Sequence, residues 1–316
     1  STTVAMRAGA KSATSVEEIM ADPEVEVVAI CSPPQFHAEQ VEAAIVAGKK
    51  AILCEKPFAV SREEAQHLAA IAQESGVPIV IGAMHTHDSA WLVARESWGD
   101  LGETAHTVHS SIDLPMNPRY EDWATEVHSR AGAETAQERS DSGYQEPDGR
   151  WWSEDSPADS LRDAVLGLIV HNLPMVRTFV PTIESLDLAK VFDPFGYVIT
   201  LHGEGRLVEL FGHMHNQWLP RWTFDVWGAS NALHIDFPPS FVHAGGATAT
   251  IYDAKGSRTF GPYAQNGYER EWLQLAEFAR GKPQPPEDLH RVIDDLTYAV
   301  EVAERAVAAL KTGAAV

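Results

Sequence analysis

The chain has 316 residues, of which 24 are basic and 45 acidic, so its formal charge is −21, and 44% of its residues are hydrophobic. This composition is typical of a folded protein. Because no basic cluster exceeds Lys49-Lys50 and no apolar run approaches the roughly 18 residues of a membrane-spanning helix, we expect neither nucleic acid nor a membrane as a partner. One hydrophobic core usually divides at roughly 250 to 300 residues, so the length predicts two domains.

The first third of the chain alternates strand and helix patterns. Apolar runs rich in β-branched residues predict strands buried on both faces at 25–30, 51–54 and 77–84. Helical spacing predicts helices at 15–22, 35–47 and 61–76, with Ser15 and Ser61 as N-caps and Gly76 as a C-cap. Because repeated βα units form a parallel sheet covered by helices, the fold class is α/β.

The pattern changes after Met84. Helices are predicted at 90–97, 161–180, 268–280 and 289–310, and strand segments at 104–112, 195–211, 222–237 and 247–260. These strands alternate in polarity, which predicts a second, mostly antiparallel sheet. Between Arg119 and Pro157 the chain is polar with little periodicity, so we expect a lid or an excursion with its own short helices.

Two cysteines, Cys31 and Cys54, each end an apolar run that is typical of a buried strand. Such positions suit reduced thiols. We therefore expect a cytoplasmic protein.

The strand ends carry the first candidate functional residues. Glu55-Lys56-Pro57 follows the strand predicted at 51–54, and ligands of open α/β sheets bind beyond the carboxyl ends of strands. Pro57 favours an extended Lys56, which aims this side chain out of the strand end. Ser32-Pro33 leaves the preceding strand similarly, and His37 begins a helix whose free N–H groups could bind an anion. The alternatives are a surface ion pair at Glu55-Lys56 and a capping or solvent-facing His37.

Histidine pairs suggest a second kind of site. His85-Thr-His87 and His213-Met-His215 each place two imidazoles on one face of a predicted strand, where they could chelate a metal. Packing and sugar contact are the alternatives for such pairs. We favour a substrate contact for His85 and predict no metal site. Trp222, in a strand-like segment, fits either stacking on a sugar ring or a place in the core.

Three segments carry a family resemblance. Residues 23–34, 37–44 and 48–57 resemble the nucleotide-binding domain of the glucose-fructose oxidoreductase, inositol dehydrogenase and MocA family. The resemblance implies that residues 1–86 are the C-terminal part of a Rossmann dinucleotide-binding domain. It also implies that residues 87–316 form a substrate-binding and oligomerisation α/β domain with a large, mostly antiparallel open sheet. A homodimer or homotetramer is expected.

The resemblance further implies an enzyme that uses NAD or NADP to oxidise or reduce a sugar, cyclitol or related polyol. It assigns catalysis to Lys56 and His171. It assigns cofactor binding to Ser32, Pro33, His37, Glu55 and Lys56, and substrate binding to His85, His87 and Asn172.

Two departures from the family pattern leave alternatives open. The first domain has no Gly-x-Gly-x-x-Gly turn to hold a pyrophosphate, and residue 1 is Ser, so we expect an N-terminal strand-helix-strand unit to be missing from this sequence. Gly167 stands where the family has the aspartate of Asp-x-x-x-His, although His171 is present. The alternatives are a catalytically silent homologue that acts as a binding or assembly subunit, and a metal-dependent lyase or hydrolase on the same fold.

Overall fold

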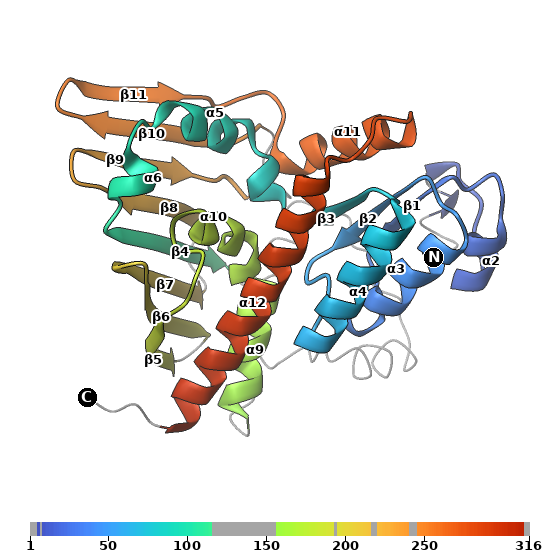
Figure 1. The fold of residues 1–316 in the computed structure, drawn as a ribbon, viewed down its shortest axis with the longest axis horizontal. Helices are drawn as coiled ribbons and strands as arrows, with labels where there is room; N and C mark the ends of the chain where they lie inside the picture. Colours follow the sequence, from blue (N-terminus) through green and yellow to red (C-terminus); the bar gives the residue numbers. More distant parts are fainter. Residues whose placement is uncertain are drawn as a thin grey trace. The chain divides into compact units, whose positions relative to one another are not determined.

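The computed structural model describes residues 5–6, 8–115, 156–192, 195–215, 220–239 and 245–312 (Figure 1). The chain divides into two compact units. Unit 1 comprises Ser1–Gly82 and Trp272–Asp294, and unit 2 comprises Ala83–Glu271 and Asp295–Val316. The domain boundary expected after residue 86 stays a prediction. The expected excursion at 119–157 lies outside the described residues except at its last two positions.

The sheet of unit 1 has three parallel strands in the order β1-β2-β3. They are β1 (Val27–Ile30), β2 (Ala51–Glu55) and β3 (Ile79–Gly82). The first four residues of β2, the central strand, are buried, as a strand covered on both faces requires. Leu275 and Phe278 of α11 (Gly267–Ala279) pack in one cluster with Ala51, Leu53 and Val80. The predicted parallel sheet is therefore confirmed.

Local capping explains where the helices of unit 1 begin and end. Ser15 Oγ accepts the N–H of Glu18 at the start of α2 (Val16–Ala21), at 3.2 Å. Ser61 Oγ accepts that of Glu64 at the start of α4 (Arg62–Ser75), at 3.1 Å. Gly76 ends α4 with a φ of 66°, which favours glycine. These three predicted caps are confirmed.

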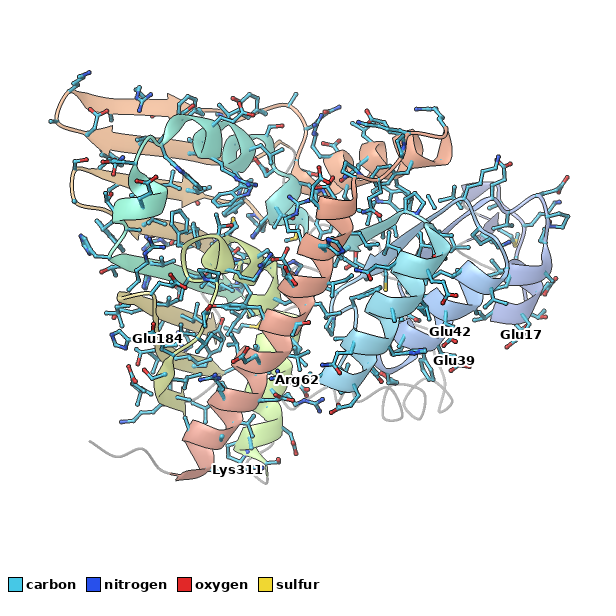
Figure 2. All side chains as sticks on the ribbon, viewed as in Figure 1. Glu17, Glu39, Glu42, Arg62, Glu184 and Lys311 are labelled. Atoms are coloured by element: carbon cyan, nitrogen blue, oxygen red, sulfur yellow. The ribbon has the colours of Figure 1, made fainter. Side chains whose placement is uncertain are left out.

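The helix expected at 35–47 begins as a 3-10 turn, η1 (Pro34–Phe36), and continues as α3 (His37–Val46). Figure 2 labels Glu17 on α2 and the pair Glu39 and Glu42 on α3, all of them exposed. The acidic side chains therefore lie on the solvated side of these helices.

Unit 2 contains an eight-stranded sheet in the order β11-β10-β9-β8-β4-β7-β6-β5. Every neighbouring pair is antiparallel except β4 and β7, so the predicted mostly antiparallel sheet is confirmed. In chain order the strands are β4 (Thr107–Pro115), β5 (Ser185–Phe192), β6 (Gly196–Gly203), β7 (Arg206–His215), β8 (Arg221–Trp227), β9 (Asn231–Asp236), β10 (Thr248–Asp253) and β11 (Gly256–Phe260).

One face of this sheet forms the core of unit 2. Along β4, buried residues alternate with half-buried ones, as expected when only one face of a strand is covered. Trp91 of α5 (Ser89–Ser97) meets Phe224 of β8 edge to face at 5.9 Å. Trp98, which follows α5, packs on Phe179 of α10 (Leu173–Phe179) at 5.0 Å. Helices α5 and α10 thus cover the buried face (Figure 1).

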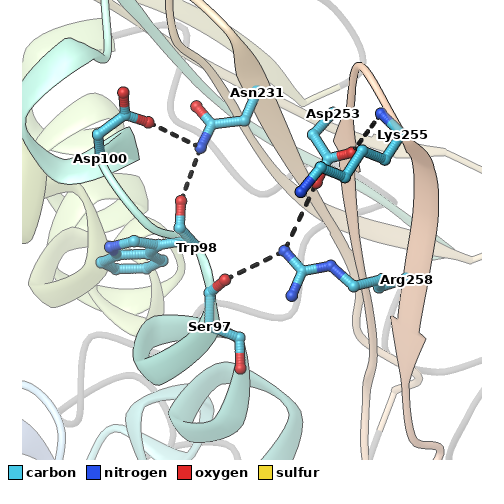
Figure 3. A network of polar contacts seen from close by, with 7 residues as sticks. All are labelled: Ser97, Trp98, Asp100, Asn231, Asp253, Lys255 and Arg258. Atoms are coloured by element: carbon cyan, nitrogen blue, oxygen red, sulfur yellow. Dashed lines mark hydrogen bonds and ion pairs between the residues drawn. The ribbon is translucent and has the colours of Figure 1, made fainter.

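A polar network fixes the end of α5 against the sheet (Figure 3). Asn231 Nδ2 donates to Trp98 O at 2.6 Å and to Asp100 Oδ1, next to α6 (Leu101–Thr104), at 3.2 Å. Arg258 of β11 donates to Ser97 O at 3.2 Å and lies 3.7 Å from the Asp253 carboxylate. The hairpin of β10 and β11 is therefore tied to the helix that covers its neighbours.

The structure corrects the single helix predicted at 161–180. The chain forms α9 (Pro157–Gly167), a 3-10 turn η3 (Ile169–His171) and α10. Gly167 has low helix propensity, and Pro174 at the start of α10 cannot donate to a preceding turn. The spacing of one α-helical turn expected between positions 167 and 171 therefore does not hold.

Two further predictions about elements are wrong. His85 and His87 lie in a 3-10 helix, η2 (Met84–His87), and not on a strand. Because a 3-10 helix turns every three residues, side chains two positions apart do not share a face. Strand β5 was not expected, because the register shift between Leu186 and Leu188 disrupts its alternation. The closing helix is α12 (Pro286–Thr312).

Candidate functional site

The carboxyl end of β2 carries the predicted pair Glu55 and Lys56. Glu55 is in register with Gly82 of β3, and its Oε2 accepts the N–H of Lys56 at 3.3 Å. A Cβ at Gly82 would lie only 2.8 Å from Oε2 and 2.9 Å from Cδ of Glu55. The carboxylate therefore lies over Gly82, in space that only glycine leaves open.

Burial perturbs both side chains of this pair. Burial raises the pKa of Glu55, while the Lys56 ammonium, the Lys56 N–H and the charge of His37 lower it. Burial lowers the pKa of Lys56, and the Glu55 carboxylate opposes that change. Each charge thus stabilises the other at a strand end where desolvation disfavours both. A lysine with a lowered pKa is suited to donating a hydrogen bond or a proton to a reacting oxygen.

Ser32, Pro33 and His37 lie at the carboxyl end of the neighbouring strand β1. Ser32 Oγ donates to Gln40 Oε1 of α3 at 2.8 Å. The His37 ring is buried and lies 2.7 Å from Ser32 O through Nε2 and 2.8 Å from Pro57 O through Nδ1. Unit 1 therefore brings together all five predicted cofactor-binding residues at the ends of β1 and β2.

Unit 2 holds a second polar cluster, fully buried. His85 Nδ1 lies 2.6 Å from Asn172 Oδ1, and Asn172 Nδ2 donates to Ser110 Oγ at 2.8 Å. The exposed fractions of His85, Asn172 and Ser110 are 2%, 0% and 1%. Because the amide nitrogen of Asn172 faces the serine, its oxygen faces His85, and the proton of this imidazole is assigned to Nδ1.

Aromatic rings surround His85. It stacks on Phe237 with 3.8 Å between ring centroids, meets Trp222 edge to face at 4.5 Å, and has His171 at 5.8 Å. His171 also meets Trp222, at 5.3 Å. Within the described part of the chain, His85 Nε2 and Trp222 Nε1 are buried without a hydrogen-bond partner. One acceptor and one donor are therefore both available to a bound hydroxyl group.

Burial lowers the pKa of His85 to about 3, against the opposing effect of the hydrogen bond with Asn172. The ring is consequently neutral at physiological pH, with Nε2 as a hydrogen-bond acceptor.

The two sets of predicted residues divide between the two units. Unit 1 holds the residues predicted for the cofactor together with Lys56, and unit 2 holds His85, His87, His171 and Asn172. The joint action of Lys56 and His171 stays a prediction. The sequence reasoning missed Ser110 and Phe237. Ser110 had a signal, because it is a polar residue in the buried alternation of β4.

In the part of the chain that the structure describes, no group of three or more His, Cys, Asp or Glu side chains could hold a metal ion. His213 lies on β7 and packs near Phe192, with 5.5 Å between ring centroids. No helix among these residues is long and apolar enough to cross a membrane.

Comparison with known proteins finds a family match in the N-terminal part of the chain. Residues 1–83 match the Gfo/Idh/MocA model, which is described as an oxidoreductase family with an NAD-binding Rossmann fold. A 1,5-anhydro-D-fructose reductase from Ensifer adhaerens is 47% identical over 127 residues, which are 39% of this chain and 37% of the reductase. An inositol 2-dehydrogenase from Pseudomonas syringae is 38% identical over 104 residues, 31% of each chain. The chain thus spans about a third of these curated relatives, and residues 1–83 carry its match to this oxidoreductase family.

Solved structures extend the likeness in fold to both units. A UDP-N-acetylglucosamine 3-dehydrogenase from Acidithiobacillus ferrooxidans has a TM-score of 0.66 at 18% identity and covers 98% of this chain and 87% of its own. A 3-ketoreductase from Actinomadura kijaniata, solved with NADP and TDP-benzene, also has a TM-score of 0.66, at 17% identity, with 95% and 83% covered. At these identities the likeness concerns the fold.

Proposed function

We propose that the protein is an NAD(P)-dependent oxidoreductase that transfers a hydride to or from a carbinol carbon of a sugar, cyclitol or related polyol. The observation that carries the proposal is Lys56, with its lowered pKa, at the carboxyl end of β2 in the segment that matches the family model. Ligands of parallel sheets bind at this edge. The two curated relatives are named for a sugar derivative, 1,5-anhydro-D-fructose, and for a cyclitol, inositol.

The cofactor fits the residues of unit 1 in part. The carboxyl ends of β1 and β2 carry Ser32, Pro33, His37, Glu55 and Lys56, and we place the nicotinamide end of the cofactor there. A Gly-rich turn for the pyrophosphate does not occur among the residues that the structure describes in unit 1. When bound, the cofactor would accept or supply the hydride. This chain's residues bind and orient it.

The reaction also needs a proton to move to or from the reacting oxygen. In the proposal Lys56 Nζ hydrogen-bonds that oxygen and stabilises the alkoxide charge as it develops, and His171 relays the proton. His85 Nε2 accepts a hydrogen bond from a substrate hydroxyl, with His87 beside it at the end of η2. Asn172 acts on the substrate through His85, because both polar atoms of its amide are already bound within the protein.

Two measurements on the complete protein test the function. Titration with NADH and NADPH should show binding of at least one of them. Absorbance at the nicotinamide band should then follow turnover with a panel of sugars, cyclitols and polyols. Lys56→Ala should lower kcat by about 100-fold or more, because a hydrogen bond made mainly in the transition state is lost. Lys50→Ala, at an exposed lysine, is the matched control.

The other outcomes identify the alternatives. Dinucleotide binding without turnover on any substrate would favour a silent binding or assembly subunit. Activity that chelators abolish and that needs no nicotinamide would favour a metal-dependent lyase or hydrolase.

We also propose a homodimer or homotetramer. Trp227 and Tyr252, on neighbouring parts of the large sheet, are 41% and 48% exposed, which leaves apolar surface available for a contact. Light scattering after size-exclusion chromatography would test this, and a monomer at micromolar concentration would contradict it.

A further inference from the structure

His37, the first residue of α3, contacts the backbone of two separate strand-end segments. Its Nε2 lies 2.7 Å from the carbonyl oxygen of Ser32, just beyond β1, and its Nδ1 lies 2.8 Å from that of Pro57, just beyond β2. The residue is only 1% exposed. Both ring nitrogens of one buried imidazole therefore face oxygens of the main chain.

The two contacts require two protons. A carbonyl oxygen can only accept a hydrogen bond, and a neutral imidazole carries a single N–H. In the neutral ring, the second nitrogen would direct its lone pair at an oxygen less than 3 Å away. Only the imidazolium donates from both nitrogens. Hydrogen bonds at both contacts would therefore require the doubly protonated ring.

The nearby carboxylate of Glu55 compensates this buried charge. Burial raises the pKa of Glu55, and the charges of Lys56 and His37 act in the opposite direction. Other polar side chains on the helices of unit 1 are exposed or bound elsewhere. On α3, Glu39 is exposed and Gln40 binds Ser32.

On α4, His67 pairs with the exposed Glu42 at 3.1 Å, and Glu64 accepts the N–H of Val60 at 2.9 Å. The 3-10 turn η1 has no ionisable side chain. Glu55 is thus the carboxylate that balances His37.

We propose that His37 is a positioning residue which, as an imidazolium, holds the Ser32-Pro33 and Glu55-Lys56-Pro57 segments at a fixed spacing. The inference rests on the proposed function, because these segments are where we place the cofactor and the reacting oxygen. His37 acts through the two carbonyl groups, and Ser32 is held a second time by its own bond to Gln40.

When His37 loses its proton, one of the two carbonyl contacts is lost and the spacing between the segments is no longer fixed. The affinity for the dinucleotide should therefore fall as His37 is deprotonated, and a variant without the second donor should lack this pH dependence.

Nuclear magnetic resonance of the wild-type protein with ¹⁵N-labelled histidine tests the double donor directly. We expect two ring N–H groups on His37 that exchange slowly with water at pH 5.5, with His37→Gln identifying the signals. A single N–H at that pH, or ring protons that exchange as fast as those of the exposed His67, would overturn the proposal. The measurement needs no cofactor.

Dinucleotide titration between pH 5.5 and 8 tests the positioning role. His37→Gln has its two N–H donors on a single nitrogen, so it does not place a donor at each of the positions of Nδ1 and Nε2. Its Kd should rise about tenfold at low pH, which corresponds to about 1.4 kcal/mol, and should vary less with pH than that of the wild type. His67→Gln is the matched control and should behave as the wild type.

Equal affinities of His37→Gln and wild type at every pH would overturn the positioning role. If the wild type binds neither NADH nor NADPH, the proposed function fails, and the resonance experiment alone then decides whether His37 is the double donor.

Discussion

The imidazole Nδ1 of His85 and the amide oxygen of Asn172 lie 2.6 Å apart, although 87 positions separate the two residues. Asn172 is oriented in turn by Ser110 Oγ on β4, at 2.8 Å. This chain of contacts leaves Nε2 of His85 without a proton and, among the described residues, without a partner. A buried acceptor of this kind is suited to a hydrogen bond from a substrate hydroxyl, because an unsatisfied polar group is costly away from water.

Replacing the Asn172 amide by a carboxylate should change His85 Nε2 from a hydrogen-bond acceptor to a donor. In Asn172→Asp, a negative charge next to Nδ1 should raise the pKa of His85 from about 3 towards the ordinary histidine range. Nε2 would then become a donor near neutral pH, and substrate affinity should fall. A pH titration followed by nuclear magnetic resonance measures the pKa of the His85 ring. An unchanged pKa would show that the contact with residue 172 does not set the protonation state of His85.

The same burial predicts how stability depends on pH. The pKa of His85 is about 3 in the folded state, below the 6.5 of an ordinary histidine, so only the unfolded chain takes up this proton between those values. The free energy of unfolding should therefore fall on acidification through that window, by up to about 1.4 kcal/mol per pH unit.

Denaturant unfolding at several pH values measures this slope. His85→Phe should make it shallower, because the site no longer titrates. His106→Phe, at an exposed histidine of the same unit, should leave it unchanged. If the free energy of unfolding of His85→Phe depended on pH as steeply as that of the wild type, the pH dependence would not come from His85.

Lys49 and Lys50 are adjacent lysines with opposite surroundings. Lys49 is buried, and its Nζ donates to the carbonyl oxygens of Ile19, Asp22 and Val25 at 3.1, 3.0 and 2.8 Å. Lys50 pairs with Glu26 at the surface.

Lys49→Met should lower the free energy of unfolding by about 2–3 kcal/mol, because three carbonyl groups at the end of α2 lose a charged donor. Lys50→Met should change it by less than about 1 kcal/mol. Chemical denaturation of both variants measures the difference, and equal effects would show that the buried ammonium does not stabilise this end of α2.

Features set by local interactions could be predicted from the sequence. Ser61 and Gly76 cap the two ends of α4 and act only on its first and last turns. The strands of unit 1 are continuous apolar runs. The division of residues 161–180 into α9, η3 and α10 could not be predicted from local patterns. The apolar spacing of this region continues across Gly167 and Asn172, so periodicity alone does not show the break that Gly167 and Pro174 favour.

The sequence predicted individual residues of the candidate site but not the hydrogen bonds between them. Lys56, His37 and His85 stand out by residue type and by position after a strand. Their partners do not, because the carbonyl oxygens of Ser32 and Pro57 are present at every residue of a chain. Ser110 comes close to His85 only when β4 is placed within the large sheet.

Gly82→Ala tests the place of Glu55 at the strand ends. An added Cβ would lie 2.8–3.1 Å from the carboxyl atoms of Glu55, so the carboxylate must move away from β3 and from the Lys56 N–H. Only the end of a flexible side chain has to shift, so the free energy of unfolding should change by less than about 1 kcal/mol. Dinucleotide affinity should fall several-fold, because the Glu55 carboxylate no longer balances the charges of Lys56 and His37.

Gly167→Ala, where a Cβ meets nothing within 4 Å, is the control. Wild-type affinity in Gly82→Ala, measured by the same titration, would remove Glu55 from the binding site.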